Sequence, residues 1–181
     1  GDKSSIPLSK KLYDLKLPMG RLKTGTPARI KMSSLDLSVM EPQPGEAPTP
    51  WMTLTENKPE HVEQLPCYIT RTNSTTHEII NRNIEKSAMY SGNITGIGPR
   101  YCPSIEDKIF KFANKESHQI FIEPEGIGVD LVYPNGISTS LPQNIQDSFI
   151  RTISGMEDSV ITEYGYAVEY DFIDPRSLHQ T

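Results

Sequence analysis

One stretch of the sequence, Gly98 to Phe112, places a rigid bend, a cation, an aromatic ring and a thiol in consecutive positions. The thiol belongs to Cys102, and the cation two residues before it is Arg100. A nearby positive charge favours thiolate over thiol, and the thiolate is the reactive form of cysteine. Two interpretations remain open from the residues alone: a reactive or proton-relaying cysteine, or a small buried residue that caps a helix.

A helix is predicted directly after this thiol. Pro103 suits the first position of a helix, because its missing N–H would have no partner there. Ile105, Ile109 and Phe112 recur at helical spacing and give this helix one apolar face. The positive end of the helix dipole would then lie close to Cys102 and favour the thiolate further.

The glycine-rich stretches do not match the common nucleotide-binding motifs. Gly20 and Gly25 have the spacing of a phosphate-binding loop, but Thr26 replaces the lysine that should reach the phosphates. A dinucleotide fingerprint also fails, because Tyr101 occupies its third glycine position. Besides a solvated strand and turn, a weaker site stays open in which hydroxyls and cations meet a ligand anion: Lys23, Thr24, Thr26 and Arg29.

The remaining polar groups predict no metal centre. The four histidines show no ligand spacing with one another or with a cysteine. Glu123 and Glu125 would face one side of a strand and could serve acid–base chemistry, although Pro124 and a turn favour a solvated rim. Cys67 falls in a strand-like segment and is expected to be a half-buried structural thiol.

Composition limits the class of protein. The 181 residues carry a net charge of −5 and are 35% hydrophobic and 23% charged, which predicts one soluble globular domain. The acidic balance argues against a nucleic-acid platform formed by this chain alone. No apolar run reaches membrane-spanning length, and two cysteines far apart suit a reducing compartment. We therefore expect a cytoplasmic protein.

The order of the predicted elements indicates an α+β domain. Helices are expected within residues 1–17, 73–84, 103–112 and 142–153, and strands over 65–72, 117–124 and 129–133. The longest strand is expected over 160–173, where alternating aromatic residues should form a core-facing stripe. Residues 32–63 contain five prolines and are expected to form a long loop that Trp51 pins to the body of the domain.

Many ordered segments, spread over nearly the whole chain, carry a resemblance to one family: Gly1–Ser5, Gly20–Pro27, Pro66–Thr70, Thr76–Ile80, Met89–Gly92, Gly98–Lys108, Glu123–Gly126, Tyr133–Pro142, Gly165–Ala167 and Glu169–Phe172. They resemble MnmG (also called GidA), a family of flavin-dependent enzymes that modify uridine in tRNA. Ala28 departs from the pattern, because the family has a second proline there. The resemblance implies an α+β domain with a mixed, largely antiparallel sheet and flanking helices, inserted into a two-dinucleotide-binding flavoprotein fold.

The resemblance also implies an activity. With the GTPase MnmE, the whole protein would install a carboxymethylaminomethyl or aminomethyl group on the wobble uridine of tRNA. It would use FAD, NADH and methylene-tetrahydrofolate and form a homodimer. Cys102 corresponds to a catalytic candidate and Ser5 to a residue at the FAD. NADH binding would fall to consecutive residues: Gly98, Pro99, Arg100, Tyr101, Cys102, Pro103, Ser104, Ile105, Glu106, Asp107, Lys108, Ile109, Phe110, Lys111 and Phe112.

The same resemblance divides the chain, which looks like the middle of a longer protein. Residues 1–30 would join the FAD-binding domain, 31–65 form a proline-rich loop, 66–175 form the inserted nicotinamide-side domain, and 176–181 return towards the FAD-binding domain. An inserted domain should have adjacent ends, so Gly1 and Thr181 are expected to lie close together. We expect the segment to be inactive alone. A non-catalytic binding or dimerisation module and an unrelated thiol enzyme stay open as alternatives.

Overall fold

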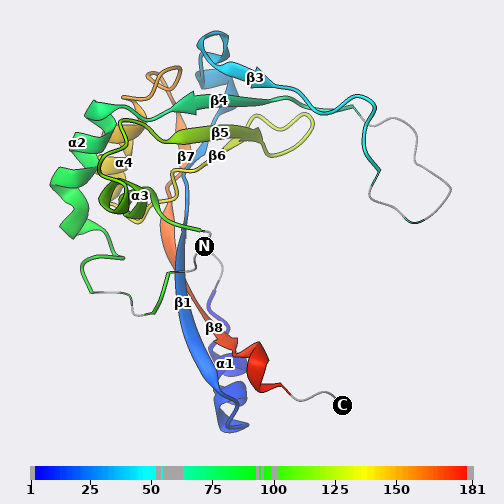
Figure 1. Cartoon of the computed structure of the whole chain (residues 1–181), viewed down its shortest axis with the longest axis vertical. Coiled ribbons are helices and arrows are strands. Elements are labelled where there is room, and N and C mark those ends of the chain that lie inside the picture. Colours follow the sequence, from blue (N-terminus) through cyan, green and yellow to red (C-terminus); the bar gives the residue numbers. More distant parts are fainter. Residues whose placement is uncertain are drawn as a thin grey trace.

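The computed structural model describes residues 3–51, 54, 63–92, 94, 96–98 and 102–178. It contains a six-stranded antiparallel sheet in the order β3-β4-β5-β6-β2-β7 and a separate antiparallel ribbon of β1 and β8 (Figure 1). The strands are β1 (Met19–Thr26), β2 (Arg29–Ile30), β3 (Glu41–Gln43), β4 (Cys67–Arg71), β5 (Gln119–Pro124), β6 (Val132–Asn135), β7 (Ile161–Glu163) and β8 (Tyr166–Ile173). The α-helices are α1 (Ile6–Asp14), α2 (Ser74–Asn83), α3 (Ile105–Lys111) and α4 (Gln143–Ile150). The predicted α+β class with a largely antiparallel sheet is confirmed.

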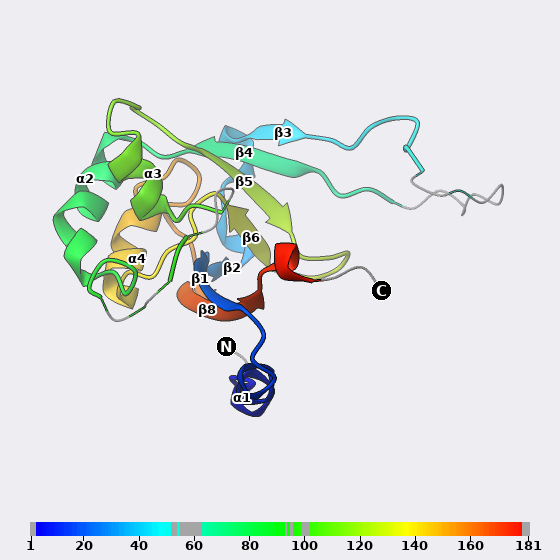
Figure 2. The same ribbon diagram turned by 60° about the horizontal axis from the view of Figure 1, so that its bottom comes forward.

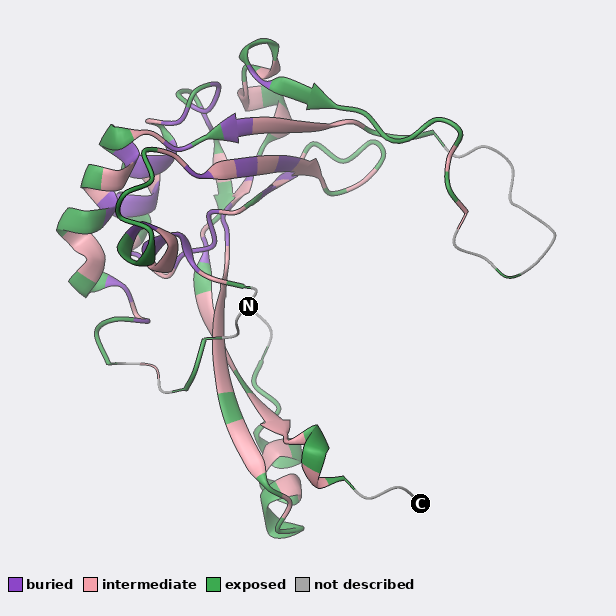
Figure 3. Cartoon of the chain, in the orientation of Figure 1, coloured by how far each residue is buried: buried purple, intermediate pink, exposed green. Residues whose placement is uncertain are grey.

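The hydrophobic core lies where α2, α3 and α4 gather beside the six-stranded sheet (Figures 1 and 2). Ile80 of α2, Ile105 of α3, Phe149 of α4 and Ile120 of β5 are all fully buried. Burial of each such side chain contributes about 1.5–3 kcal/mol. Figure 3 shows the buried residues concentrated in this part of the molecule, whereas α1 has none. The ribbon and α1 therefore extend away from the core.

Helix α2 begins where the sequence predicts it. Asn73 Oδ1 accepts a hydrogen bond from Thr76 N (3.0 Å), and Thr76 Oγ1 accepts one from Asn73 N (3.3 Å). Two of the N–H groups that a helix start leaves unpaired are satisfied in this way. Asn73 Nδ2 also donates to Thr152 O (2.6 Å), which fixes the start of α2 against the turn that follows α4.

The chain enters and leaves this domain through the ribbon. Strand β1 pairs with β8 from Met19 opposite Ile173 to Thr26 opposite Tyr166. Beyond the ribbon, Asp174 N donates to Pro18 O (3.1 Å). The described segments before β1 and after β8 thus meet at one end of the ribbon, as expected of an inserted domain. Gly1 and Thr181 themselves lie outside the described residues.

The prediction of one long strand over 160–173 is wrong. The chain leaves the six-stranded sheet after β7 and joins the ribbon as β8, with Gly165 between the two strands. Gln146, buried in α4, donates to Gly165 O and accepts from Gly165 N, both at 2.8 Å. A Cβ at Gly165 would lie 2.5 Å from Thr26 O. The aromatic stripe does not face the core either, since Tyr166 and Tyr170 are exposed.

Two further predictions need correction. Strand β6 begins at Val132, not Val129, because a turn fills the gap, with Val129 N donating to Gly126 O (3.2 Å). The proline-rich region is not simply a loop. It contains two 3-10 turns and β3, whose Pro42 is tolerated because β3 is an edge strand.

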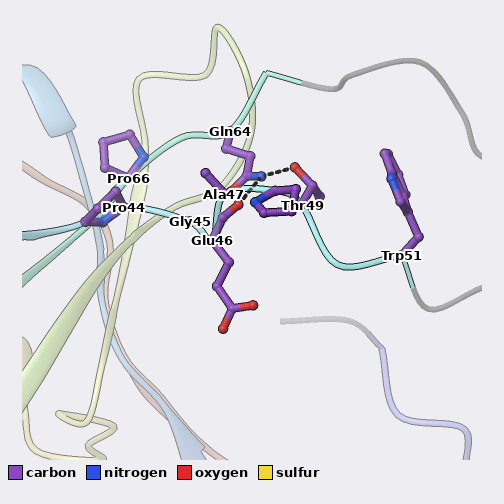
Figure 4. Close-up of a pocket in the computed structure, with 9 residues that line it drawn as sticks. Pro44, Gly45, Glu46, Ala47, Thr49, Trp51, Gln64 and Pro66 are labelled. Atoms are coloured by element: carbon purple, nitrogen blue, oxygen red, sulfur yellow. Dashed lines mark hydrogen bonds between the residues drawn. The ribbon is translucent and has the colours of Figure 1, made fainter.

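Trp51 lies on an arm that extends β3 and β4 away from the sheet (Figure 1). It lines a cavity of about 570 Å³ whose described lining residues all belong to this arm, within 44–51 and 64–66 (Figure 4). Gln64 Nε2 donates to Thr49 Oγ1 (2.5 Å) and Glu46 O (3.4 Å), so the two sides of the arm bind each other. The prediction that Trp51 pins this region to the body of the domain is therefore wrong.

Candidate functional site

A cleft of about 250 Å³ surrounds Cys102, where β1, the turn after α2 and α3 meet. The lining residues of this Cys102 cleft are Lys23, Thr24, Met89, Tyr90, Gly98, Cys102, Asp107, Phe110 and Lys111. Segment 96–98 reaches it by pairing with β1, because Lys23 N donates to Ile97 O (3.1 Å) and Ile97 N to Arg21 O (3.3 Å). Gly96 permits this approach: its φ is +122°, and a Cβ there would lie 3.0 Å from Arg21 O.

The thiol of Cys102 is exposed and held from β1. Thr24 Oγ1 donates a hydrogen bond to Cys102 Sγ at 3.1 Å. The ammonium of Lys108 donates to Gly136 O (2.8 Å). Burial lowers the pKa of Lys108, and the negative charge of a Cys102 thiolate acts in the opposite direction. A hydroxyl donor and a neighbouring cation are the partners that suit a thiolate.

Helix α3 starts later than the sequence predicts. Ser104, not Pro103 or the thiol, caps the helix, and its side chain accepts from Asp107 N (3.1 Å). Cys102 therefore precedes the cap, and the interpretation of a buried, helix-capping cysteine is wrong. The predicted apolar face holds for Ile105 and Ile109, whereas Phe112 is exposed at the end of the helix.

Two aromatic rings and an ion pair form the opposite side of the Cys102 cleft. Tyr90 and Phe110 meet edge to face, with ring centroids 6.4 Å apart. Tyr90 Oη donates to Asp107 Oδ1 (2.9 Å), and Lys111 Nζ lies 3.3 Å from the same oxygen. Burial raises the pKa of Tyr90, and the hydrogen bond to Asp107 and the charges of Asp107 and Glu106 raise it further. Tyr90 is therefore a neutral phenol at physiological pH and not a general base.

A buried carboxylate fixes this side of the cleft from behind. Glu106 Oε1 accepts from Ser87 Oγ (3.0 Å), Thr139 Oγ1 (2.9 Å) and Ser140 N (3.0 Å). Ser140 Oγ accepts in turn from Met89 N (3.2 Å), directly before Tyr90. The second oxygen, Glu106 Oε2, is buried without a hydrogen-bond partner. The turn that carries Met89 is thus attached to α3 through a network of hydrogen bonds in which Glu106 Oε2 alone has no partner among the groups named here.

The structure divides the predicted NADH-binding residues into four groups. Those that line the Cys102 cleft are Gly98, Cys102, Asp107, Phe110 and Lys111. Those buried in the protein are Ser104, Ile105, Glu106 and Ile109. Those that neither line the Cys102 cleft nor are buried are Pro103, Lys108 and Phe112. Those outside the described residues are Pro99, Arg100 and Tyr101. The buried residues position the helix and cannot contact a ligand in the cleft.

Tyr90 and Met89 were missed by residue-level reasoning. Their segment contributed to the family resemblance, but its residue types and spacing predict no site. Only the tertiary fold brings it to the Cys102 cleft. Of the possible anion-binding group, Lys23 and Thr24 do line the cleft. Arg29 does not: it pairs with Glu125, donates to Pro27 O (2.9 Å) and lies 4.4 Å from the Tyr133 ring centroid.

Ser5 lies in a different place. It lines a cavity of about 410 Å³ between α1 and the ribbon, together with Ser4, Ile6, Leu8, Ser9, Leu12, Arg21, Glu169, Tyr170 and Asp171. Arg21 is paired with both carboxylates of this cavity, at 3.1 Å from Glu169 and 2.8 Å from Asp171. Ser5 precedes α1 without a side-chain capping bond, so its hydroxyl can meet a ligand.

The histidines and carboxylates of the described residues form neither a metal centre nor a pair for acid–base chemistry on one strand. Among the described residues, no three His, Cys, Asp or Glu side chains gather as a metal ligand set. Within that same part of the chain, no helix is long and apolar enough to cross a membrane. Glu123 accepts from Asn135 Nδ2 (3.0 Å) and Glu125 pairs with Arg29, so the two carboxylates serve separate contacts.

The two thiols should differ in reactivity. We expect Cys102 to be alkylated roughly tenfold faster than Cys67 at about pH 8. Cys102 is exposed, whereas burial and the charge of Glu123 raise the pKa of Cys67, which leaves little thiolate there. Alkylation of Cys67 should keep increasing as the pH passes about 9. Brief iodoacetamide treatment with peptide mass mapping measures both rates, and equal rates at the lower pH would contradict this prediction.

The antiparallel ribbon of β1 and β8, the six-stranded sheet with its helices and the exposed thiol in a small cleft define an α+β domain with a candidate thiol site. The family profile described as Glucose inhibited division protein A matches residues 1–181, so the chain belongs to this family, GidA or MnmG. The structure of Aquifex aeolicus GidA in the form I crystal is similar, with a TM-score of 0.79 and 48% identity over 91% of this chain. The form II crystal gives 0.80 and 43% over 95%. The chain spans 28% of either relative.

Proposed function

We propose that this chain is the central segment of a tRNA-modifying flavoenzyme. With FAD, NADH, methylene-tetrahydrofolate and the GTPase MnmE, the whole protein adds a carboxymethylaminomethyl group to the wobble uridine of tRNA. The observation that carries the proposal is the exposed thiol of Cys102, hydrogen-bonded by Thr24 in a cleft of a GidA-family chain. The segment by itself is inactive, because the family resemblance assigns the rest of the cofactor and tRNA sites to other parts of the protein.

The division of the chain is the one that the resemblance implies, and the ribbon supports it. Residues 1–30 and 176–181 form the junctions with the FAD-binding domain, and the bond from Asp174 N to Pro18 O brings the segments on either side of the ribbon together. Residues 66–175 are the inserted nicotinamide-side domain, and 31–65 are its proline-rich region. The whole protein is a cytoplasmic homodimer.

The residues present fit one ring of NADH better than the whole cofactor. The Cys102 cleft is smaller than the roughly 300–1,000 Å³ of typical ligand pockets. Its exposed Phe110 and Lys111 can contact the cofactor at the rim, and the remainder would lie against parts of the protein beyond this chain. NADH supplies a hydride when bound.

The residues at Ser5 fit FAD in part. The Ser5 hydroxyl is available, and Arg21 offsets the two carboxylates that would otherwise repel a diphosphate. FAD would therefore contact α1 at the junction, while its main binding loop belongs to the FAD-binding domain.

Cys102 acts on the uridine in one of two ways. Its thiolate adds to C6 of the uracil ring, the C5–C6 double bond opens and its electron pair passes to the C4 carbonyl, and the C–S bond breaks again when that double bond re-forms; or its thiol carries a proton to or from the base. Thr24 positions the sulfur in both cases. Both roles need the sulfur exposed to the cleft, as it is.

The test is the nucleoside content of tRNA from cells that lack the full-length gene. We expect the carboxymethylaminomethyl group to disappear from the wobble uridine and to return when the gene is restored. Mass spectrometry of digested tRNA measures both states. Unchanged modification in the deletion strain would refute the proposed function.

A further inference from the structure

The size of the Cys102 cleft limits what can reach the sulfur. At about 250 Å³ it is smaller than the roughly 300–1,000 Å³ of typical ligand pockets, so it suits a small group such as a single base. If Cys102 acts on uridine, as the proposed function states, the base must touch the sulfur during the reaction. The uracil base then lies in the cleft at that moment.

The cleft offers an aromatic surface for this ring. Tyr90 and Phe110 both line it, and both are partly exposed, at 38% and 66%. Their planes differ by 63°, so the rings meet edge to face and each ring keeps at least one face that the other does not cover. Aromatic side chains with a free face are the usual platform for an unstacked base in RNA recognition.

Tyr90 is the better held of the two rings. Its phenol is bonded to Asp107, and the residue before it is bonded through Met89 N to Ser140. Phe110 has no polar anchor and is the more exposed ring. A ring fixed at both ends loses little conformational freedom when a ligand stacks on it, which favours binding.

We propose that Tyr90 is the stacking residue that holds the target uracil of the tRNA against Cys102. Lys23 and Lys111 line the same cleft, and each ammonium has three N–H donors. Lys23 donates to Met89 O and Lys111 pairs with Asp107. They can meet the two carbonyl oxygens of uracil or the flanking phosphates. Tyr90 thus supplies contact area, and the lysines supply polar contacts.

The test compares two RNAs rather than two activities. The full-length protein is titrated with an anticodon stem-loop that carries uridine at the wobble position, and with the same RNA lacking only that base. Phosphate contacts are common to both, so the ratio of dissociation constants isolates the base. For the unaltered protein we expect a ratio of roughly 5 to 150.

Three variants make the test specific. Tyr90→Leu should bring this ratio close to one, and Tyr90→Phe should keep it, because the ring remains while the bond to Asp107 is lost. Tyr166→Leu, at an exposed tyrosine outside the cleft, should leave it unchanged. The affinity for NADH should stay the same in all three variants.

A ratio of one in the unaltered protein, or an unchanged ratio in Tyr90→Leu, overturns the proposal. A loss of NADH affinity in Tyr90→Leu with an unchanged RNA ratio also overturns it and assigns the ring to nicotinamide. Because binding needs no turnover, the result is separate from the proposed function. The ratio of dissociation constants can respond to Tyr90 even if the tRNA of the deletion strain is still modified.

Discussion

Replacing Cys102 with serine in the full-length protein is expected to abolish tRNA modification while the fold survives. Serine keeps the size of the side chain and can still accept a hydrogen bond from Thr24. It cannot form an anion at neutral pH, so both roles of the thiol are lost. Losing a proton relay costs about 10²–10⁴ in rate, and losing a nucleophile costs at least as much.

The modified nucleoside formed per unit time by purified protein, its GTPase partner and substrate tRNA measures this effect. Cys67→Ser is the matched control, because that thiol is half-buried in β4 and lies outside the Cys102 cleft. It should retain most activity. Modification by Cys102→Ser at a rate near that of Cys67→Ser would refute the catalytic role. A protein–RNA adduct that survives denaturation and requires Cys102 would select attack over proton transfer.

The class of fold was predictable from the sequence, because it depends on local patterns, and local patterns also singled out Cys102 as a candidate. The capped start of α2 at Asn73 and the apolar spacing of Ile105 and Ile109 are local features. The start of α3 was misplaced although its signal was present. Ser104 and Asp107 have the spacing of a helix cap, and the serine hydroxyl outweighs the preference of Pro103 for the first position.

The walls of the Cys102 cleft were not predictable in the same way. Tyr90 lines the cleft because Glu106, Ser140 and Asp107 fix its turn against α3. Those hydrogen bonds join segments far apart in the sequence, and the spacing of apolar residues along the chain does not predict them. The break between β7 and β8 has a similar cause, since it depends on the buried amide of Gln146 bound to Gly165. Alternation of aromatic residues reports an extended chain but not the sheet that the chain joins.

Replacing Glu106 with leucine is expected to lower the local stability of the cleft wall by about 3 kcal/mol. Three donors would lose their common acceptor: Ser87 Oγ, Thr139 Oγ1 and Ser140 N. Each buried donor left unpaired costs about 1–3 kcal/mol. Glu106 Oε2 is buried without a partner, so removing the side chain also removes an unfavourable group. The net loss of stability is therefore smaller than the sum of the costs of three unpaired donors.

Hydrogen exchange in the full-length protein measures this loss where it occurs. The amides of Ser140 and Met89 should lose roughly 100-fold of their protection in Glu106→Leu, while peptides from α1 stay unchanged. Glu106→Gln keeps an oxygen acceptor in the same place and should lose far less. Glu85→Leu, at an exposed glutamate before the same turn, should have almost no effect. Equal protection in the leucine and glutamine variants would show that the carboxylate does not hold Tyr90 in place, and base binding should then be unaltered in both.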